Sequence, residues 1–312
     1  AASDVYKRQM PILGKRIGQV LADQELKLEQ MVIPTEPERG EQWILRYYDH
    51  YFPVTEGTES LPLEVLVERQ HYRLAHWKVA DEELNYRRFF DVDTLAALRV
   101  EERDVFDSTH ALLLELFNAG YIDAFRVDHP DGLADPAGYF HWLSEATGGA
   151  WIAAEKILED AERLPSDWPI AGTTGYDTSW RLTALQVDPR ASLPLGTLMQ
   201  TLTGDSPSSY PQMQREAKAQ IIDTSLAAEV RRIGQLIWKI CQNDFRLRDY
   251  TFRSLVDCLR ELIIEMPCYR AYVTVGNPAP ALSREIVQAA AGRALRYLNP
   301  EHADTMAVVI AL

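Results

Sequence analysis

Two acidic residues that follow short apolar segments are the first candidates for chemistry in this chain. Asp128 ends the segment YIDAFRVD, and Glu155 ends the segment WIAAE. Each segment has the length and apolar content of a buried strand, and the helical pattern between them indicates parallel strands. Parallel strands present functional side chains at their carboxyl ends, about 4.8 Å from the neighbouring strand. The spacing therefore predicts two carboxylates at one edge, near the roughly 5 to 5.5 Å carboxyl separation of retaining glycosidases.

Asp128 has a cationic neighbour on its own face of the predicted strand. Strand alternation places Ala124, Arg126 and Asp128 on one face. A permanent positive charge nearby favours the ionised carboxylate that a nucleophile requires, and the small Ala124 leaves open space beside it. A purely structural ion pair between Arg126 and Asp128 fits the same pattern, so both interpretations stay open.

Glu155 is expected in a different setting. Trp151 and Ala153, four and two residues before it, are apolar and share its face. Burial among apolar side chains favours the protonated form of a carboxyl group, which suits a general acid. Because Lys156 follows directly, a polar strand end without a catalytic role is the alternative.

The elements that must hold these carboxylates follow a repeating order between residues 104 and 177. We expect a helix that opens at Asp104 and ends before Gly120, a strand over 121–128, a helix that begins at Asp135, and strands at 151–154 and near 169–172. The first helix is expected to form its apolar face from Val105, Leu112, Leu113, Leu116 and Phe117. This order is typical of an α/β fold with a parallel sheet.

The flanking regions have other patterns. Residues 10–80 alternate strand-like pieces, such as 25–28 and 43–48, with turns rich in Pro and Gly, which predicts an irregular subdomain. Beyond Pro189 the apolar residues recur at helical spacing. One amphipathic helix is predicted through Ile222, Leu226, Val230, Ile233, Ile237 and Ile240, a second through Leu255, Leu259, Leu262, Ile263 and Met266, and a third from about Ser283.

The composition argues against several classes of protein. The 312 residues carry 32 Lys and Arg against 46 Asp and Glu, a net charge of −14. Such a chain suits neither nucleic acid nor an anionic membrane, because both need a basic surface. The three cysteines fit neither a disulfide framework nor a zinc site, so a reducing, cytoplasmic location is expected. The longest apolar run, 306–312, is far shorter than the roughly 20 residues of a membrane span.

The first nine residues, AASDVYKRQ, resemble the translation of a transposase adapter used to prepare DNA for sequencing. We therefore expect residues 1–9 to be a non-native, adapter-derived segment and the gene to be interrupted at its 5′ side. Their only charged residues are Asp4, Lys7 and Arg8, so the acidic balance of the chain does not depend on them.

Several longer motifs together resemble one family. AFRVDHPDGLADP, AAEKILEDAERLP and AGTTGYD resemble maltooligosyl trehalose synthase of the α-amylase clan. The stretches RYYDHYFPVTEGT, ERQHYRLAHWKVADEELNYRRFFDV and MPCYRAYV are also similar to that family, so the likeness extends from residue 10 to about 275. The Arg-x-Asp element marks the whole clan. HPDGL, EKIL and NYRRFFD are more specific to its trehalose-forming branch.

The resemblance implies an α/β fold, namely a partial TIM (β/α)8 barrel with an irregular N-terminal subdomain and a helical C-terminal insertion. Residues 10–80 would form the α+β subdomain, 81–190 the central part of the catalytic barrel, and 191–312 the helical insertion. The implied reaction of the full-length parent is an intramolecular transglucosylation that needs no cofactor. It converts the reducing-end α-1,4 linkage of a maltooligosaccharide to α,α-1,1, and the product would pass to a trehalose-releasing hydrolase.

The resemblance also implies roles for single residues. Asp128 matches the nucleophile, Glu155 the general acid/base, and Arg126 the arginine that accompanies the nucleophile. Further contacts with the glucan are expected from His129, Tyr86, Arg87, Arg88 and Tyr176. Aromatic residues at such spacings also serve in packing, and that alternative stays open for Tyr86 and Tyr176.

The chain departs from the family in three ways. It lacks the clan's early Asn-His segment and the late strand that carries the third carboxylate, and Ala124 stands where the family usually has Gly. We therefore expect this polypeptide alone to be an incomplete and inactive part of the enzyme.

Other functions stay open at the level of sequence. An α-glucan hydrolase of the same clan would use the same two carboxylates and release free sugars, whereas a non-catalytic carbohydrate-binding fragment would need neither. Asp128, His129 and Asp131 could instead ligate a cation. His71 and His76 are five residues apart, which puts them on different faces of a helix, so they are poor metal partners.

Overall fold

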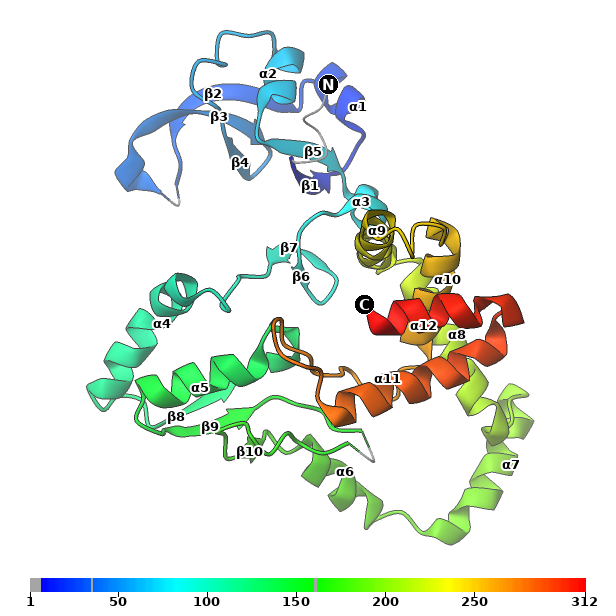
Figure 1. Cartoon of the computed structure of the whole chain (residues 1–312). Helices are drawn as coiled ribbons and strands as arrows, with labels where there is room; N and C mark the ends of the chain where they lie inside the picture. The colour runs from blue at the N-terminus through cyan, green and yellow to red at the C-terminus, as the bar shows by residue number, and fades with distance from the viewer. Residues whose placement is uncertain (1–6, 35, 160–161) are drawn as a thin grey trace. The chain divides into compact units, whose positions relative to one another are not determined.

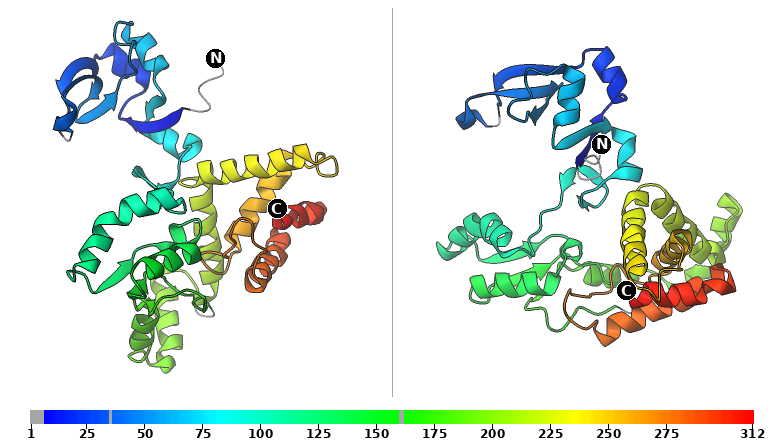
Figure 2. Two further views of the ribbon diagram at one scale, coloured as in Figure 1. Left: turned by 60° about the vertical axis from the view of Figure 1, so that its left-hand side comes forward. Right: turned by 45° about the horizontal axis from the view of Figure 1, so that its top comes forward.

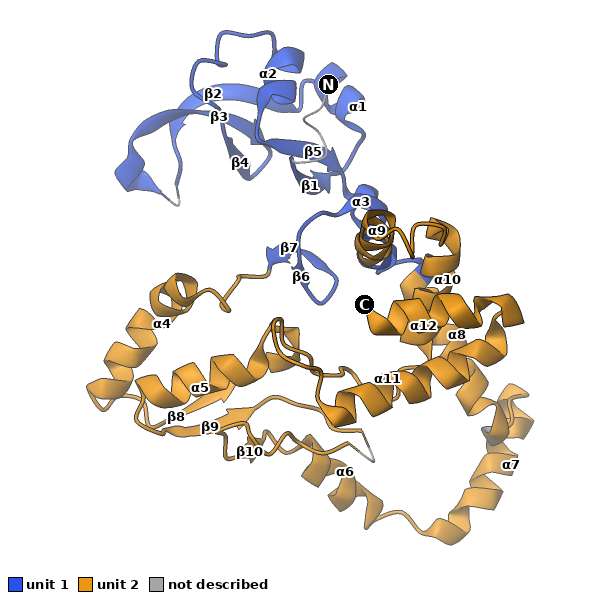
Figure 3. Cartoon of the chain, viewed as in Figure 1, with its two compact units in different colours: residues 1–96, 223–232 blue, residues 97–222, 233–312 orange. Residues whose placement is uncertain are grey.

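The computed structural model describes residues 7–34, 36–159 and 162–312, so residues 1–6 of the adapter-like segment lie outside the described part. Residues 8 and 9 of that segment begin the first strand. The chain divides into two compact units, coloured separately in Figure 3. One comprises the described residues up to Ala96 together with Asp223–Arg232, and the other comprises Ala97–Ile222 and Ile233–Leu312. The boundaries expected at 80 and 190 stay predictions.

The first unit is built on small sheets. An antiparallel sheet contains β2 (Leu26–Val32), β3 (Glu41–Tyr47) and β4 (His50–Pro53), while β1 (Arg8–Leu13) pairs in parallel with β5 (Tyr72–His76) and β6 (Arg88–Phe89) pairs with β7 (Val92–Ala96). The short helices are α1 (Ile17–Ala22), α2 (Leu63–Arg69) and α3 (Ala80–Glu83). Strands β1 to β5 and helices α1 and α2 share a core that contains Leu13, Val20, Leu26, Leu45, Tyr47, Phe52, Leu66 and Leu74. The irregular mixture of short elements predicted here is confirmed.

The second unit contains a three-stranded parallel sheet (Figure 1). Its order is β10 (Gly172–Thr173), β9 (Trp151–Ala154) and β8 (Ala124–Val127). Helix α4 (Arg103–Asn118) precedes β8, and α5 (Pro136–Ala146) connects β8 to β9. Asp135 caps α5 by accepting a hydrogen bond from the Gly138 N–H at 3.0 Å. The predicted parallel order is confirmed, and the described residues form an open sheet with no closed barrel.

Helices α4 and α5 cover one face of this sheet, which Figure 2 shows from two further directions. Phe106 of α4 and Phe140 of α5 pack with Ile152 of β9 in a buried core. The face of α4 differs from the predicted one, because Phe106 is buried whereas Leu112 and Leu113 are exposed. The apolar stripe of α4 is wider than the surface that β8 and α5 cover, so part of it stays in solvent.

The remainder of the chain is mostly helical, as predicted. It contains α6 (Tyr176–Ala184), α7 (Ser192–Thr203), α8 (Tyr210–Asp223), α9 (Ala227–Asn243), α10 (Phe252–Ile264), α11 (Ala281–Ala294) and α12 (Ala303–Ala311). The single helix predicted through residues 222–240 is wrong at its start, because the chain breaks between α8 and α9. The carbonyl oxygen of Ser225 accepts a hydrogen bond from Arg88 at 2.8 Å, outside any helical ladder. No helix in the described ranges is long and apolar enough to cross a membrane.

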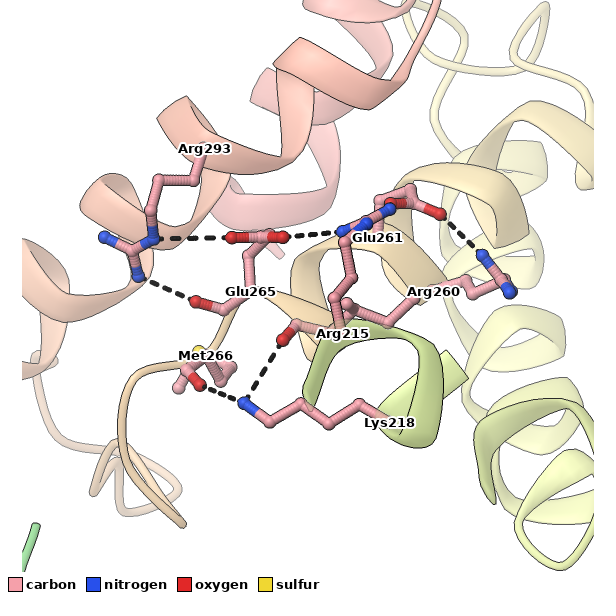
Figure 4. Close-up of polar contacts among 8 residues, drawn as sticks. Arg215, Lys218, Arg260, Glu261, Glu265, Met266 and Arg293 are labelled. Atoms are coloured by element: carbon pink, nitrogen blue, oxygen red, sulfur yellow. Dashed lines mark hydrogen bonds and ion pairs between the residues drawn. The ribbon is translucent and has the colours of Figure 1, made fainter. Parts of the chain in front are cut away.

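Charged side chains tie α8, α10 and α11 together (Figure 4). Arg215 of α8 forms ion pairs with Glu261 and Glu265 at the C-terminal end of α10. Lys218 donates hydrogen bonds to two backbone carbonyls at and just past that end. Arg293 of α11 donates to the carbonyl of Glu265 at 2.7 Å. Cations at a helix C-terminus satisfy its unpaired carbonyls and interact favourably with the helix dipole, so these contacts fix the end of α10.

Candidate active site

Asp128 and Glu155 directly follow two neighbouring strands. Val127, the last residue of β8, pairs with Ala154, the last residue of β9. The backbone N–H of Glu155 donates to the carbonyl oxygen of Val127 at 2.8 Å, which extends the ladder by one bond. Both carboxylates therefore lie at the carboxyl edge of the sheet, on adjacent strands, where their spacing predicts them.

Asp128 is paired with Arg126 on the exposed face of the sheet. The distance from Arg126 Nη1 to Asp128 Oδ1 is 2.7 Å, and the two side chains are 54% and 55% exposed. An ion pair this exposed contributes only ~0–1 kcal/mol to stability. Its main effect is to orient the Asp128 carboxylate, with the small, exposed Ala124 on the same face.

Glu155 is bonded to the loop that follows Asp128. Its carboxylate accepts a hydrogen bond from the backbone N–H of His129 at 2.9 Å. His129 has a φ of 44°, in the left-handed region, so the chain turns directly after Asp128 and this N–H is directed at the neighbouring strand. A Cβ at Gly132 would lie 2.6 Å from Nδ1 of His129, so a larger residue there would displace the His129 ring.

The apolar setting expected around Glu155 is present on one side only. Ala153 is 5% exposed, but Trp151 is 60% exposed. Trp151 begins β9 on the sheet face opposite the core formed with α4 and α5, and no described element buries it. Glu155 is therefore only partly buried, and its acid/base role rests on the resemblance.

A buried lysine lies directly beside the candidate site. Lys156 follows Glu155 and points to the opposite face, where its ammonium group lies 2.9 Å from Asp131 and 2.7 Å from Glu162. Its side chain is fully buried. Burial lowers the pKa of Lys156, but the hydrogen bonds and charges of Glu162 and Asp131 outweigh that effect, and the net pKa is raised. Lys156 therefore stays charged at neutral pH.

The cation site considered from the sequence does not form in the described residues. Asp131 is almost buried and is occupied by the Lys156 ammonium group and the Tyr272 hydroxyl. No cluster of three or more His, Cys, Asp or Glu side chains suited to a metal occurs in the described part of the chain. Sequence reasoning missed the roles of Lys156 and Tyr272, although strand alternation already turns Lys156 away from Glu155 toward the core.

The predicted glucan contacts of the NYRRFFD motif lie in the first unit. Arg88 has a 1% exposed side chain, with Nη1 2.6 Å from Asp93 and Nη2 3.1 Å from Glu229. Tyr86 is also buried and donates its hydroxyl hydrogen to the carbonyl of Asp93. Arg87 is exposed. Internal contacts thus occupy Tyr86 and Arg88, and a role in substrate binding stays a prediction for all three residues of the motif.

Tyr176 lies at the start of α6 and is 46% exposed. Together with Trp180 it lines a cavity of about 540 Å³. Ile157, two residues past Glu155, and its neighbour Leu158 form another side of this cavity. An aromatic side chain in this cavity could contact a sugar ring. The glucan contact of Tyr176 stays a prediction, and the position of Tyr176 is compatible with it.

Comparison with known proteins supports the resemblance seen in the motifs. No protein-family model matches the chain. Over 258 residues this chain is 34% identical to a Mycobacterium tuberculosis (strain H37Rv) protein named "Putative maltooligosyl trehalose synthase". The match covers 80% of this chain and 33% of the Mycobacterium protein. The solved maltooligosyltrehalose synthase from Arthrobacter ramosus is 33% identical, with a TM-score of 0.81, and the match covers 98% of this chain and 36% of the other.

A third match, a hypothetical maltooligosyl trehalose synthase of Sulfolobus tokodaii, has a TM-score of 0.71 at 24% identity, over 97% of this chain and 37% of the other. At that identity the match shows a likeness of fold alone. The resemblance to this family is confirmed by sequence and by structure. The chain spans about a third of the length of the relatives it matches.

Proposed function

We propose that this chain is part of a longer enzyme of the maltooligosyl trehalose synthase type. That enzyme would convert the reducing-end α-1,4 linkage of a maltooligosaccharide to an α,α-1,1 linkage. The observation that carries the proposal is the position of Asp128 and Glu155 directly after the carboxyl ends of two adjacent parallel strands, in a chain similar to such synthases. Strands β8, β9 and β10 would belong to a TIM (β/α)8 barrel, and their uncovered face, with Arg126, would line its interior.

The proposed reaction uses the two carboxylates in turn. Asp128 attacks the anomeric carbon at the scissile bond while Glu155 protonates the departing sugar oxygen. The released glucose turns in the site, and its anomeric hydroxyl attacks the glycosyl-enzyme intermediate with Glu155 as the base. Two inversions give net retention, as a close carboxylate pair requires. Water must be excluded, because it would capture the same intermediate and make the reaction a hydrolysis.

The proposal extends to the surroundings of the reaction. His129, Tyr176, Tyr86, Arg87 and Arg88 are proposed as contacts of the glucan substrate. The two carboxylates supply the nucleophile and the acid/base and no step changes an oxidation state, so we propose no cofactor. The product is proposed to pass to a trehalose-releasing hydrolase, with both enzymes in the cytoplasm.

Incubation of the complete protein with maltopentaose tests the function. We expect reducing ends to disappear without release of glucose. An increase in reducing ends would identify an α-glucan hydrolase, and no change would leave only a carbohydrate-binding role. Glu155→Gln and Asp128→Asn should each lower kcat by roughly 10²–10⁴-fold. Asp123→Asn is the matched control, because Asp123 is an exposed carboxylate just before β8.

A further inference from the structure

A short segment between α10 and α11 contacts the loop that follows Asp128. We name residues 269–272 the strap and residues 129–134 the Asp128 loop. The hydroxyl of Tyr269 lies 3.0 Å from Nε2 of His129. The hydroxyl of Tyr272 donates a hydrogen bond to the carboxylate of Asp131. Two tyrosines of the strap therefore bond to the loop that carries the hydrogen bond to Glu155.

Arg270 adds a third contact from the strap. Its guanidinium donates to three backbone carbonyls of the Asp128 loop, at Asp131 (3.0 Å), Leu133 and Ala134 (2.8 Å). The planar guanidinium presents its donors in a fixed fork, so one side chain can fix the path of several residues. The loop is thus held through its backbone as well as through its side chains.

Lys156 connects the same loop to strand β9. Its buried ammonium group pairs with Asp131 of the loop and with Glu162. Asp131 therefore accepts contacts from Lys156 on one side and from Tyr272 on the other. Because Lys156 adjoins Glu155 and Asp131 is three residues past Asp128, this ion pair joins the two carboxylate-bearing segments beneath the open face.

Both ends of the strap are anchored. On one side, Lys218 and Arg293 hold the C-terminal end of α10, a few residues before the strap (Figure 4). On the other side, the Ser283 hydroxyl of α11 donates to the carbonyl of Tyr272 at 2.7 Å. The Tyr272 ring also packs edge-on against Trp168, with centroids 5.2 Å apart. Because both ends of the strap are held, the strap can restrain the Asp128 loop in one position.

We propose that Tyr272, Arg270 and Lys156 are positioning residues that hold the Asp128 loop so that the His129 N–H stays bonded to Glu155. This inference rests on the proposed function, since it assigns to the helical part of the chain a role in aligning the two carboxylates. Misplacement of reacting groups by about 1 Å can cost roughly 10²-fold in rate. The strap therefore acts chiefly on the rate of the chemical step, in addition to any effect on the glucan contact proposed for His129.

The test uses Tyr272→Phe in the complete protein, which removes one hydroxyl and keeps the buried ring. We expect the amides of His129 and Gly132 to exchange with deuterium roughly tenfold faster, as the loss of one hydrogen bond implies, while the protein stays folded and its melting temperature falls by only a few degrees. With maltopentaose, kcat should fall about tenfold or more, a larger factor than any rise in KM. Tyr121→Phe is the matched control, because Tyr121 is 79% exposed and lies before β8.

Arg270→Lys provides an independent variant, since it keeps the charge but not the fork, and the same two readouts should change. Unaltered exchange at His129 in both variants would overturn the proposal, as would a larger acceleration of exchange at Ile152 of β9 than at His129. Faster local exchange with full kcat would also overturn it. A complete protein that never isomerises maltopentaose, yet shows the local exchange effect, would refute the proposed function and leave the loop contacts standing.

Discussion

At the scale of single residues, the loss of the Lys156 ammonium group should lower stability strongly. Lys156→Met keeps the length of the stem and removes the ammonium group, which leaves Asp131 and Glu162 buried without their partner. Breaking a buried ion pair in this way typically costs ~3–5 kcal/mol. We therefore expect the free energy of unfolding, measured with urea, to fall by about that amount.

The control for this change is Lys239→Met on α9, where the lysine is exposed. Exposed substitutions usually change stability by less than about 0.5 kcal/mol. A loss below about 1 kcal/mol for Lys156→Met would contradict the prediction. The pKa of Lys156 is raised on folding, so its contribution is fully present below the ordinary lysine pKa and is lost only as the pH rises through the raised value. The difference between the two variants should therefore be constant from pH 6 to 9.

The sequence predicts the edge on which Asp128 and Glu155 lie, because strand order and alternation are local patterns. Lys156 was expected only as part of a polar strand end, and its burial was missed. The partners of Lys156 could not be predicted, since Asp131 and the strap reach it only through the tertiary fold. The exposure of Trp151 was missed for a related reason, because burial of a strand residue depends on which layer covers its face.

At the scale of elements, the packing of α9 on α10 allows a sharp prediction. A Cβ added at Gly234 of α9 would lie 2.5 Å from Cγ2 of Val256 on α10. A β-branched side chain in a helix has one strongly preferred rotamer and cannot easily move aside. Gly234→Ala should therefore destabilise the second unit by about 1–3 kcal/mol, despite the better helix propensity of alanine.

Gly292→Ala is the matched control on α11, because a Cβ there meets nothing within 4 Å. It should stabilise the protein by about 0.5–1 kcal/mol, since alanine loses less entropy than glycine in a helix. Urea unfolding of both variants measures the pair. Equal and stabilising effects at the two positions would show that α9 and α10 are less closely packed than described.

The prediction of α10 from periodicity is confirmed because its apolar stripe is also its buried face, as Leu255 and Leu259 show. The prediction of one helix through residues 222–240 is wrong because periodicity continues across the break between α8 and α9. The contact of Ser225 with Arg88, 137 residues away, is invisible to a local pattern. Apolar spacing therefore predicts where helices occur, but it does not predict where a helix is interrupted.

At the scale of the whole molecule, the parallel α/β character could be predicted from the order of helices and strands, whereas the elements that would cover the open face of the sheet could not. In the described residues, β8 and β10 each pair with one strand only, and the sheet face that carries Arg126 and Trp151 is uncovered. Edges and faces of this kind are normally covered in a complete domain. The relatives that the chain matches are about three times longer. Their additional length is enough to supply elements that cover such edges and faces.

This leads to the last prediction, that the 312-residue chain alone does not isomerise maltopentaose. The open face admits water to Asp128, which is 55% exposed, so an intermediate formed there would be hydrolysed. We expect no loss of reducing ends with the 312-residue chain under conditions in which the complete protein turns over measurably. Isomerisation by the 312-residue chain would show that three strands suffice for a closed site, and release of glucose alone would show that water exclusion requires the remainder of the enzyme.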